Sequence, residues 1–132
     1  APMASMSAPR DLADLLDHLD ESFSTTLLAL IDARGLTDAQ VYKRANISRK
    51  LFSKIRSNPA YRPTKPTAVA LGVALGLTLD ELRDLLARAG FALSRSSRFD
   101  VIVEFYVVRG VYDIFRINEA LFAYDEQLLG SI

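Results

Sequence analysis

The sequence predicts an all-α fold, and three observations support that prediction. Apolar residues recur every three or four positions through most of the 132-residue chain, which is the period of amphipathic helices. Two Thr-x-x-Gln/Glu spacings, at Thr37 and Thr78, are typical of capped helix starts. Glycine, which can end a helix in the left-handed conformation, follows four of the apolar segments, at positions 35, 76, 90 and 110.

The N-terminal region is predicted to contain a tail and one helix. Residues 1–10 are expected to be a disordered tail or a cloning remnant, because no initiator methionine stands at position 1. A helix is predicted over 11–21, where Leu12, Leu15, Leu16 and Leu19 share one side. Its other side is acidic, with Asp11, Asp14, Asp17, Asp20 and Glu21.

Five helices are predicted within residues 22–90, which form one domain. The first runs near 22–34 and ends at Gly35, and the second runs over about 38–45 after the Thr37 cap. After a break at Asn46-Ile47, Ser48 is a suitable N-cap for a third helix over 48–57. Prolines in the connector after residue 57 precede a nearly all-apolar fourth helix that begins near Pro66 and stops at Gly76. Thr78 and Glu81 start the fifth, which Gly90 closes.

Residues 91–132 are predicted to form a helical extension, although a hairpin over 99–117 stays open. The run from Val101 to Val108 has high strand propensity, and Arg109-Gly110 is compatible with a hairpin turn. We favour a helix capped by Ser96 or Ser97, because the segment is long for a strand. Asp113 is the expected cap of a last helix.

The charges are segregated along the chain, although Lys and Arg together equal Asp and Glu in number. Between Lys43 and Lys65 there are eight basic residues and no acidic one. Neutralising a polyanion requires clustered Lys and Arg, so this block predicts a surface that binds phosphates. The chain has no Cys, which excludes disulfides and thiolate metal sites, and no apolar run of about 20 residues, so we expect a cytoplasmic protein without membrane insertion.

Residues 35–55 read Gly35-Leu36-Thr37-Asp38-Ala39-Gln40-Val41-Tyr42-Lys43-Arg44-Ala45-Asn46-Ile47-Ser48-Arg49-Lys50-Leu51-Phe52-Ser53-Lys54-Ile55. This stretch resembles the helix-turn-helix of the Cro and lambda-repressor (Xre-like) family. The resemblance covers about residues 22–88 and implies a five-helix, lambda-repressor-like DNA-binding bundle. Two features depart from the family pattern: Asp38 stands where Gln is frequent, and the connector from Ser57 to Lys65 is long and proline-rich.

The resemblance also implies a site. Helix 48–57 would enter the major groove of double-stranded DNA, with base edges read by Arg49, Lys50, Ser53 and Lys54. Phosphates would be contacted by Thr37, Lys43, Arg44, Ser48, Arg56, Arg62 and Lys65. The implied activity is that of a transcriptional regulator acting as a homodimer and without a cofactor.

Several alternatives remain beside this hypothesis. The bundle could serve as a protein-interaction adaptor or antitoxin-like module that does not read DNA, and RNA binding is a weaker idea. The acidic group around His18 is more typical of a solvated helix face than of a metal site, and no catalytic motif is present, so we expect no enzyme. The aromatic residues of 91–132 are interpreted as packing onto the bundle or, alternatively, as a surface for a dimer or protein partner.

Overall fold

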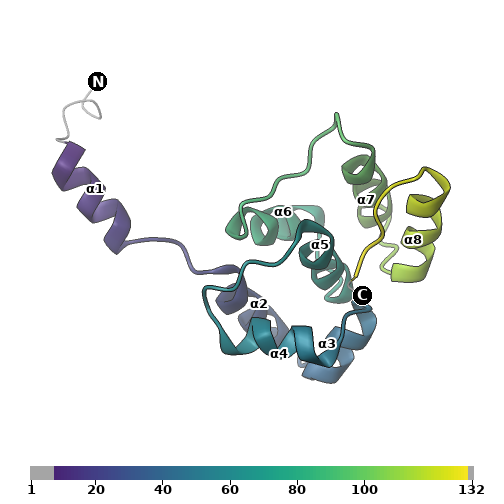
Figure 1. The fold of residues 1–132 in the computed structure, drawn as a ribbon, viewed down its shortest axis with the longest axis horizontal. Helices are drawn as coiled ribbons and strands as arrows, with labels where there is room; N and C mark the ends of the chain where they lie inside the picture. Colours follow the sequence, from purple (N-terminus) through teal and green to yellow (C-terminus); the bar gives the residue numbers. More distant parts are fainter. Residues whose placement is uncertain (1–7, 131–132) are drawn as a thin grey trace.

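The computed structural model describes residues 8–130, which form eight helices and no strand (Figure 1). The all-α prediction is therefore confirmed for this part of the chain. The helices are α1 (Ala8–Asp17), α2 (Phe23–Ala33), α3 (Asp38–Arg44), α4 (Arg49–Ser57), α5 (Lys65–Ala74), α6 (Leu79–Arg88), α7 (Arg98–Val108) and α8 (Ile114–Ala123). None of these helices is long and apolar enough to cross a membrane.

The core is organised around α5, whose residues after Lys65 are all buried. Helices α3, α6 and α8 pack against α5, while α2 packs against both α4 and α6. Because α5 is apolar on every side, it can contact neighbours all round, which explains its central position.

The hairpin alternative for 99–117 is wrong, because Arg98–Val108 is a helix capped by Ser97 and Asp113 caps α8. Val103 and Val107, four residues apart, are buried. The strand propensity of this segment is outweighed by packing of α7 against α6 and α8. The extension contacts the preceding helices through α7 on α6 and α8 on α5.

The last described residues, 125–130, form a segment that we call the strap. Leu129 is buried, and its backbone N–H donates to Asn118 Oδ1 at 2.7 Å while its carbonyl accepts from Asn118 Nδ2 at 3.2 Å. Gly130 lies against the turn between α3 and α4, where an added Cβ would come within 2.7 Å of the Asn46 carbonyl oxygen. The strap therefore connects α8 to the turn that precedes α4.

Helix α1 has different bounds from the predicted helix 11–21. It begins at Ala8, inside the predicted tail, and ends at Asp17; residues 1–7 of that tail lie outside the described residues. At the end of α1, the His18 side chain is hydrogen-bonded through Nδ1 to the Asp14 carbonyl oxygen at 2.9 Å. That carbonyl is the partner that the His18 backbone N–H would need to continue the helix. The His18 backbone N–H donates instead to the Leu15 carbonyl oxygen at 3.3 Å, which ends the helix in a tighter turn. Leu19 follows the helix and is 72% exposed.

Candidate nucleic-acid interface

Helix α4 has one buried side and one polar side. Phe52 and Ile55 are buried in the core, and the Ser48 hydroxyl accepts the Leu51 N–H at 3.0 Å, which fixes the start of the helix. The predicted base-reading residues Arg49, Lys50, Ser53 and Lys54 are all exposed. Their positions, two adjacent pairs one helical turn apart, place them on a single face.

The turn before α4 is closely fixed to α3. Asn46 adopts a left-handed conformation with φ 57°, which Asn tolerates better than most residues. Ala45 and Ile47 on either side are buried, and the Ile47 N–H donates to the Tyr42 carbonyl at 3.1 Å. The direction in which α4 leaves this turn is therefore set by backbone and core contacts.

The first turn of α3 carries a capping box and an ion pair. Thr37 accepts the Gln40 N–H, and Gln40 accepts the Thr37 N–H in return. Asp38 lies 2.7 Å from Arg56 Nε through its Oδ2. The hydrogen bond to Asp38 raises the pKa of Arg56, against a smaller opposing effect of burial. The carboxylate at this position is thus neutralised by an arginine from the end of α4.

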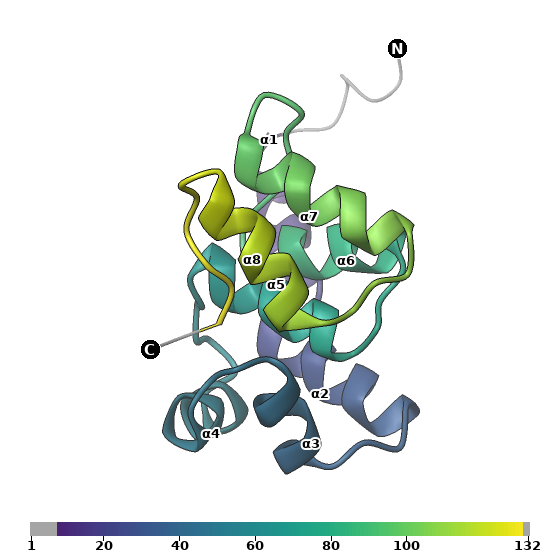
Figure 2. The ribbon, with the colours of Figure 1, turned by 90° about the vertical axis from the view of Figure 1, so that its right-hand side faces the viewer.

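The other predicted phosphate contacts fall into two groups. Lys43 and Arg44 are exposed at the end of α3, directly before the turn that leads to α4. Arg62 instead lies beside Gly90, and Lys65 contacts Asp100 of α7. Figures 1 and 2 show α3 and α4 at one end of the body and α7 at the other. The structure therefore brings Lys43 and Arg44 close to the outward face of α4, and directs Lys65 toward the extension.

The cations of this end of the molecule are available for a ligand. Within residues 11–130, none of Arg49, Lys50, Lys54, Lys43 and Arg44 forms an ion pair, and neither does Arg62 beside Gly90. By contrast, Arg34, Arg83, Arg88 and Arg95 all pair with carboxylates elsewhere in the fold. Four hollows of about 200 to 350 Å³ lie along α7 or beside Lys65, away from the α4 face. The exposed cations of α4 and of the end of α3 that are unpaired in the described part of the chain can therefore contact a polyanion.

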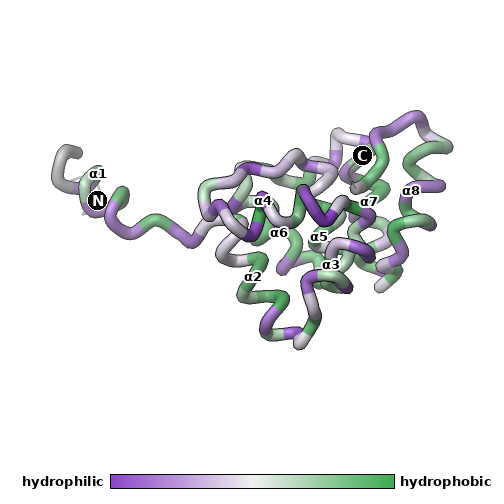
Figure 3. Tube along the Cα trace, turned by 60° about the horizontal axis from the view of Figure 1, so that its bottom comes forward, coloured by the Kyte–Doolittle hydropathy of each residue, from purple (hydrophilic) through white to green (hydrophobic). Residues whose placement is uncertain are grey.

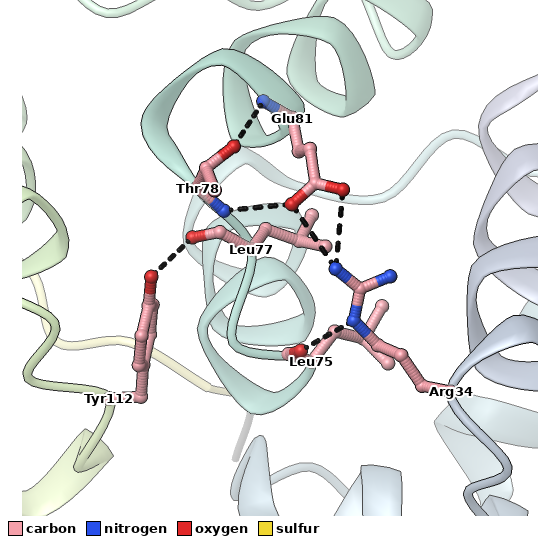
Figure 4. Close-up of polar contacts among 6 residues, drawn as sticks. All are labelled: Arg34, Leu75, Leu77, Thr78, Glu81 and Tyr112. Atoms are coloured by element: carbon pink, nitrogen blue, oxygen red, sulfur yellow. Dashed lines mark hydrogen bonds and ion pairs between the residues drawn. The ribbon is translucent and has the colours of Figure 1, made fainter.

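A polar network fixes the ends of α2 and α5 and the start of α6 relative to one another (Figure 4). Arg34 donates to the Leu75 carbonyl at 2.9 Å and to the Glu81 carboxylate at 3.1 Å. Glu81 also accepts the Thr78 N–H at 2.9 Å, and this backbone hydrogen bond, followed by Arg34, holds the pKa of Glu81 below its ordinary value. Tyr112 adds a hydrogen bond from its hydroxyl to the Leu77 carbonyl at 2.7 Å.

Comparison of the chain with protein-family models, curated proteins and solved structures gave no match. The functional interpretation therefore depends on the geometry and charge of the chain itself. Two features of that geometry were not predicted from the sequence: the Asp38–Arg56 pair and the burial of Asp100 against Lys65. Both join residues far apart along the chain, so no local sequence pattern could have indicated them.

Proposed function

We propose that the protein is a sequence-specific, double-stranded-DNA-binding transcriptional regulator of the Cro and lambda-repressor type. In this proposal α2 to α6 form the five-helix bundle, and α3, the turn at residues 45–48 and α4 form its helix-turn-helix. Helix α4 lies in the major groove, and two copies bind two half-sites as a homodimer. The protein acts in the cytoplasm, has no enzymatic activity and needs no cofactor.

The observation that carries the proposal is the outward face of α4. It combines three cations and one hydroxyl, all exposed, on a helix whose opposite side is fixed in the core. Arg and Lys can donate to the two acceptors that guanine presents in the major groove. Lys43 and Arg44 lie beside this face as phosphate ligands, with the hydroxyls of Thr37 and Ser48 as further donors.

The proposal is tested by selecting duplexes from a randomised pool and titrating the enriched sequence at several salt concentrations. The wild type is compared with Arg49→Ala/Lys54→Ala and with a charge-matched control, Arg83→Ala/Arg116→Ala, on α6 and α8. We expect a two-fold-symmetric motif, an affinity loss of at least tenfold in the α4 variant, and little change in the control. The logarithm of the affinity should fall with the logarithm of salt by about 0.9 per phosphate contacted.

Equal effects of the two variants, or binding without any enriched motif, would contradict sequence-specific recognition through α4. A protein-interaction adaptor is the second candidate, because Phe115, Phe122 and Tyr124 of the extension are exposed. That candidate predicts association with a protein partner that tolerates salt and is unaffected by Arg49→Ala/Lys54→Ala.

A further inference from the structure

Two apolar surfaces of the chain have no partner within the described residues. The first is the leucine side of α1, where Leu12, Leu15 and Leu16 are more than half exposed, and Leu19 follows them. In Figure 3, α1 stands clear of the body, with hydrophobic and hydrophilic residues interleaved along it. Helices this short are marginal in water without a packed face. We therefore expect the leucine side of α1 to pack against another apolar surface.

The second surface is a groove along α7 and α8. Its largest hollow, of about 350 Å³, is lined by Val101, Ile102, Phe105, Tyr106, Ala120 and Tyr124, which define the α7–α8 groove. Two smaller hollows adjoin it, and both share Val101 with it. The exposed side chains at its floor include Val101 and Phe105, which are 42% and 47% exposed. The groove is therefore a continuous apolar surface that runs along a helix pair.

The charges of the two surfaces are opposite. The leucine side of α1 is bordered by Asp11, one turn before Leu15. Asp14 and Asp17 lie on the opposite side of the same helix, and Asp20 and Glu21 follow it. The groove is bordered by Arg95, Arg98 and Arg109. Arg98 lies over the Tyr124 ring at 5.7 Å and Arg109 over the Phe105 ring at 3.6 Å, so both guanidinium groups are held at the edge of the apolar floor. Glu104, also at this edge, is paired with Arg83 and Arg95.

We infer that α1 of one copy packs into the α7–α8 groove of a second copy, with the two helices exchanged reciprocally. The spacing of Leu12, Leu15, Leu16 and Leu19 is the i, i+3, i+4, i+7 pattern by which an amphipathic helix enters an apolar groove. Asp11 then lies toward the arginine border, while Asp14 and Asp17 on the outer side of α1 add to the negative charge of the helix, and reciprocal exchange closes a two-fold dimer. Figures 1 and 3 show α1 and the α7–α8 pair at opposite ends of one chain, which favours exchange between copies over folding back.

This inference specifies the dimer of the proposed function, but does not depend on DNA binding. Association is measured without DNA by sedimentation equilibrium, so failure of either proposal is detected separately. The variants are Leu15→Asp/Leu16→Asp in α1 and Val101→Asp/Phe105→Asp in the groove. Phe115→Asp/Phe122→Asp is the matched control, since both residues are exposed on α8 and neither lines any of the three hollows. Circular dichroism checks that each variant keeps its helix content.

We expect a wild-type dimer, at least a tenfold weaker association in the α1 and groove variants, and no change in the control. Mixing the α1 variant with the groove variant should restore association, because one intact helix then meets one intact groove. A monomeric wild type, an equally impaired control, or a mixture that stays dissociated would overturn the inference.

Disulfide trapping separates exchange between copies from packing within one chain. The chain contains no Cys, so Leu16→Cys/Val101→Cys introduces the only two thiols. Oxidation should give a covalent dimer on a non-reducing gel. A disulfide confined to the monomer would show that α1 covers the groove of its own chain and would overturn the exchange.

Discussion

In the proposed complex with DNA, the ion pair between Asp38 and Arg56 would change what each residue can contribute to binding. Asp38 places a carboxylate where an approaching phosphate would be repelled, and Arg56 compensates for that charge. Both side chains are substantially exposed, so the pair contributes at most about 1 kcal/mol to folding stability. Under the proposed function, we therefore expect the pair to affect DNA affinity more than folding stability.

Replacing Asp38 by Asn should therefore tighten duplex binding several-fold, because the repulsion is removed and Arg56 is released toward phosphate. Arg56→Ala should weaken binding, since the Asp38 charge is then uncompensated. Titration of both variants and the double variant against the selected duplex gives the coupling between the two residues. Weaker binding by Asp38→Asn would show that the pair is needed intact, and would exclude Arg56 as a free phosphate ligand.

Lys65 and Asp100 form a pair of a different kind, because Asp100 is only 2% exposed. The Lys65 ammonium lies 2.7 Å from Oδ1 of Asp100, and the Ser94 N–H donates to Oδ2 at 2.7 Å. This pair joins the start of α5 to α7. Without the Lys65 ammonium, the buried Asp100 carboxylate would keep only one hydrogen-bond donor, the neutral N–H of Ser94.

We expect Lys65→Met to lower the free energy of unfolding by about 3 kcal/mol, the lower end for breaking a buried pair, because Lys65 itself keeps 26% of its side chain exposed. Asp100→Asn should cost less, since Lys65 can then turn toward water. Urea unfolding of the two variants measures both values. If Asp100→Asn destabilises the fold as much as Lys65→Met, or more, then the unpaired buried carboxylate is not the cause of the loss of stability.

At the scale of helices, the cap of α6 is linked to pH through Glu81. The folded-state pKa of Glu81 is lowered from its ordinary value of 4.5, first by the Thr78 N–H and then by Arg34. A lowered pKa means that ionised Glu81 stabilises the fold above pH 4.5, and that this contribution is lost as the pH falls through the folded-state pKa.

Thermal unfolding between pH 2 and 6 should show this loss below about pH 4.5 in the wild type. Glu81→Gln keeps an acceptor for the Thr78 N–H but cannot ionise, so its acid destabilisation should be shallower. Thr78→Ala serves as a control that weakens the same cap while retaining the carboxylate. If Glu81→Gln and the wild type lose stability in parallel, Glu81 does not contribute to the acid transition.

The strap provides a second prediction at this scale. Gly130 has φ 93° and no room for a side chain, while Gly110 has a similar φ of 70° with nothing within 4 Å of an added Cβ. Gly110→Ala should therefore lower the free energy of unfolding only by the strain of a side chain at positive φ, about 1 kcal/mol. Gly130→Ala should cost more and also displace the strap from Asn46. Urea unfolding, with hydrogen exchange at the Leu129 amide, measures both effects, and equal costs would contradict a tight contact.

Helices could be predicted where their signals are local. Thr37 and Thr78 with their capping partners, and Ser48 before α4, marked starts that the structure confirms. The end of α1 was predicted wrongly, because the apolar spacing continues to Leu19 while the His18 backbone N–H bonds to Leu15 and its side chain to Asp14. For α7, the strand propensity of its residues kept a hairpin open as an alternative. The helix is favoured by packing against α6 and α8, which the sequence does not reveal.

At the scale of the whole molecule, the candidate site was partly predictable. The outward direction of Arg49, Lys50, Ser53 and Lys54 follows from the buried positions of Phe52 and Ile55 on the same helix. The basic block as a whole does not form one surface, since Lys65 is directed toward Asp100. Clustering along the sequence does not ensure clustering in space, and for Lys65 the difference arises from a contact across the fold.

The strap also has a thermodynamic consequence. It contacts the turn from which α4 leaves, and it is held by Asn118 of α8. If the docked strap favours the orientation of α4 that binds the duplex in the proposed complex, docking of the strap and binding of the duplex are linked equilibria. Each then promotes the other. The factor by which the docked strap raises the affinity for the duplex equals the factor by which the bound duplex raises the equilibrium constant for docking of the strap. DNA bound at one end of the molecule would then slow hydrogen exchange at Leu129 by that same factor.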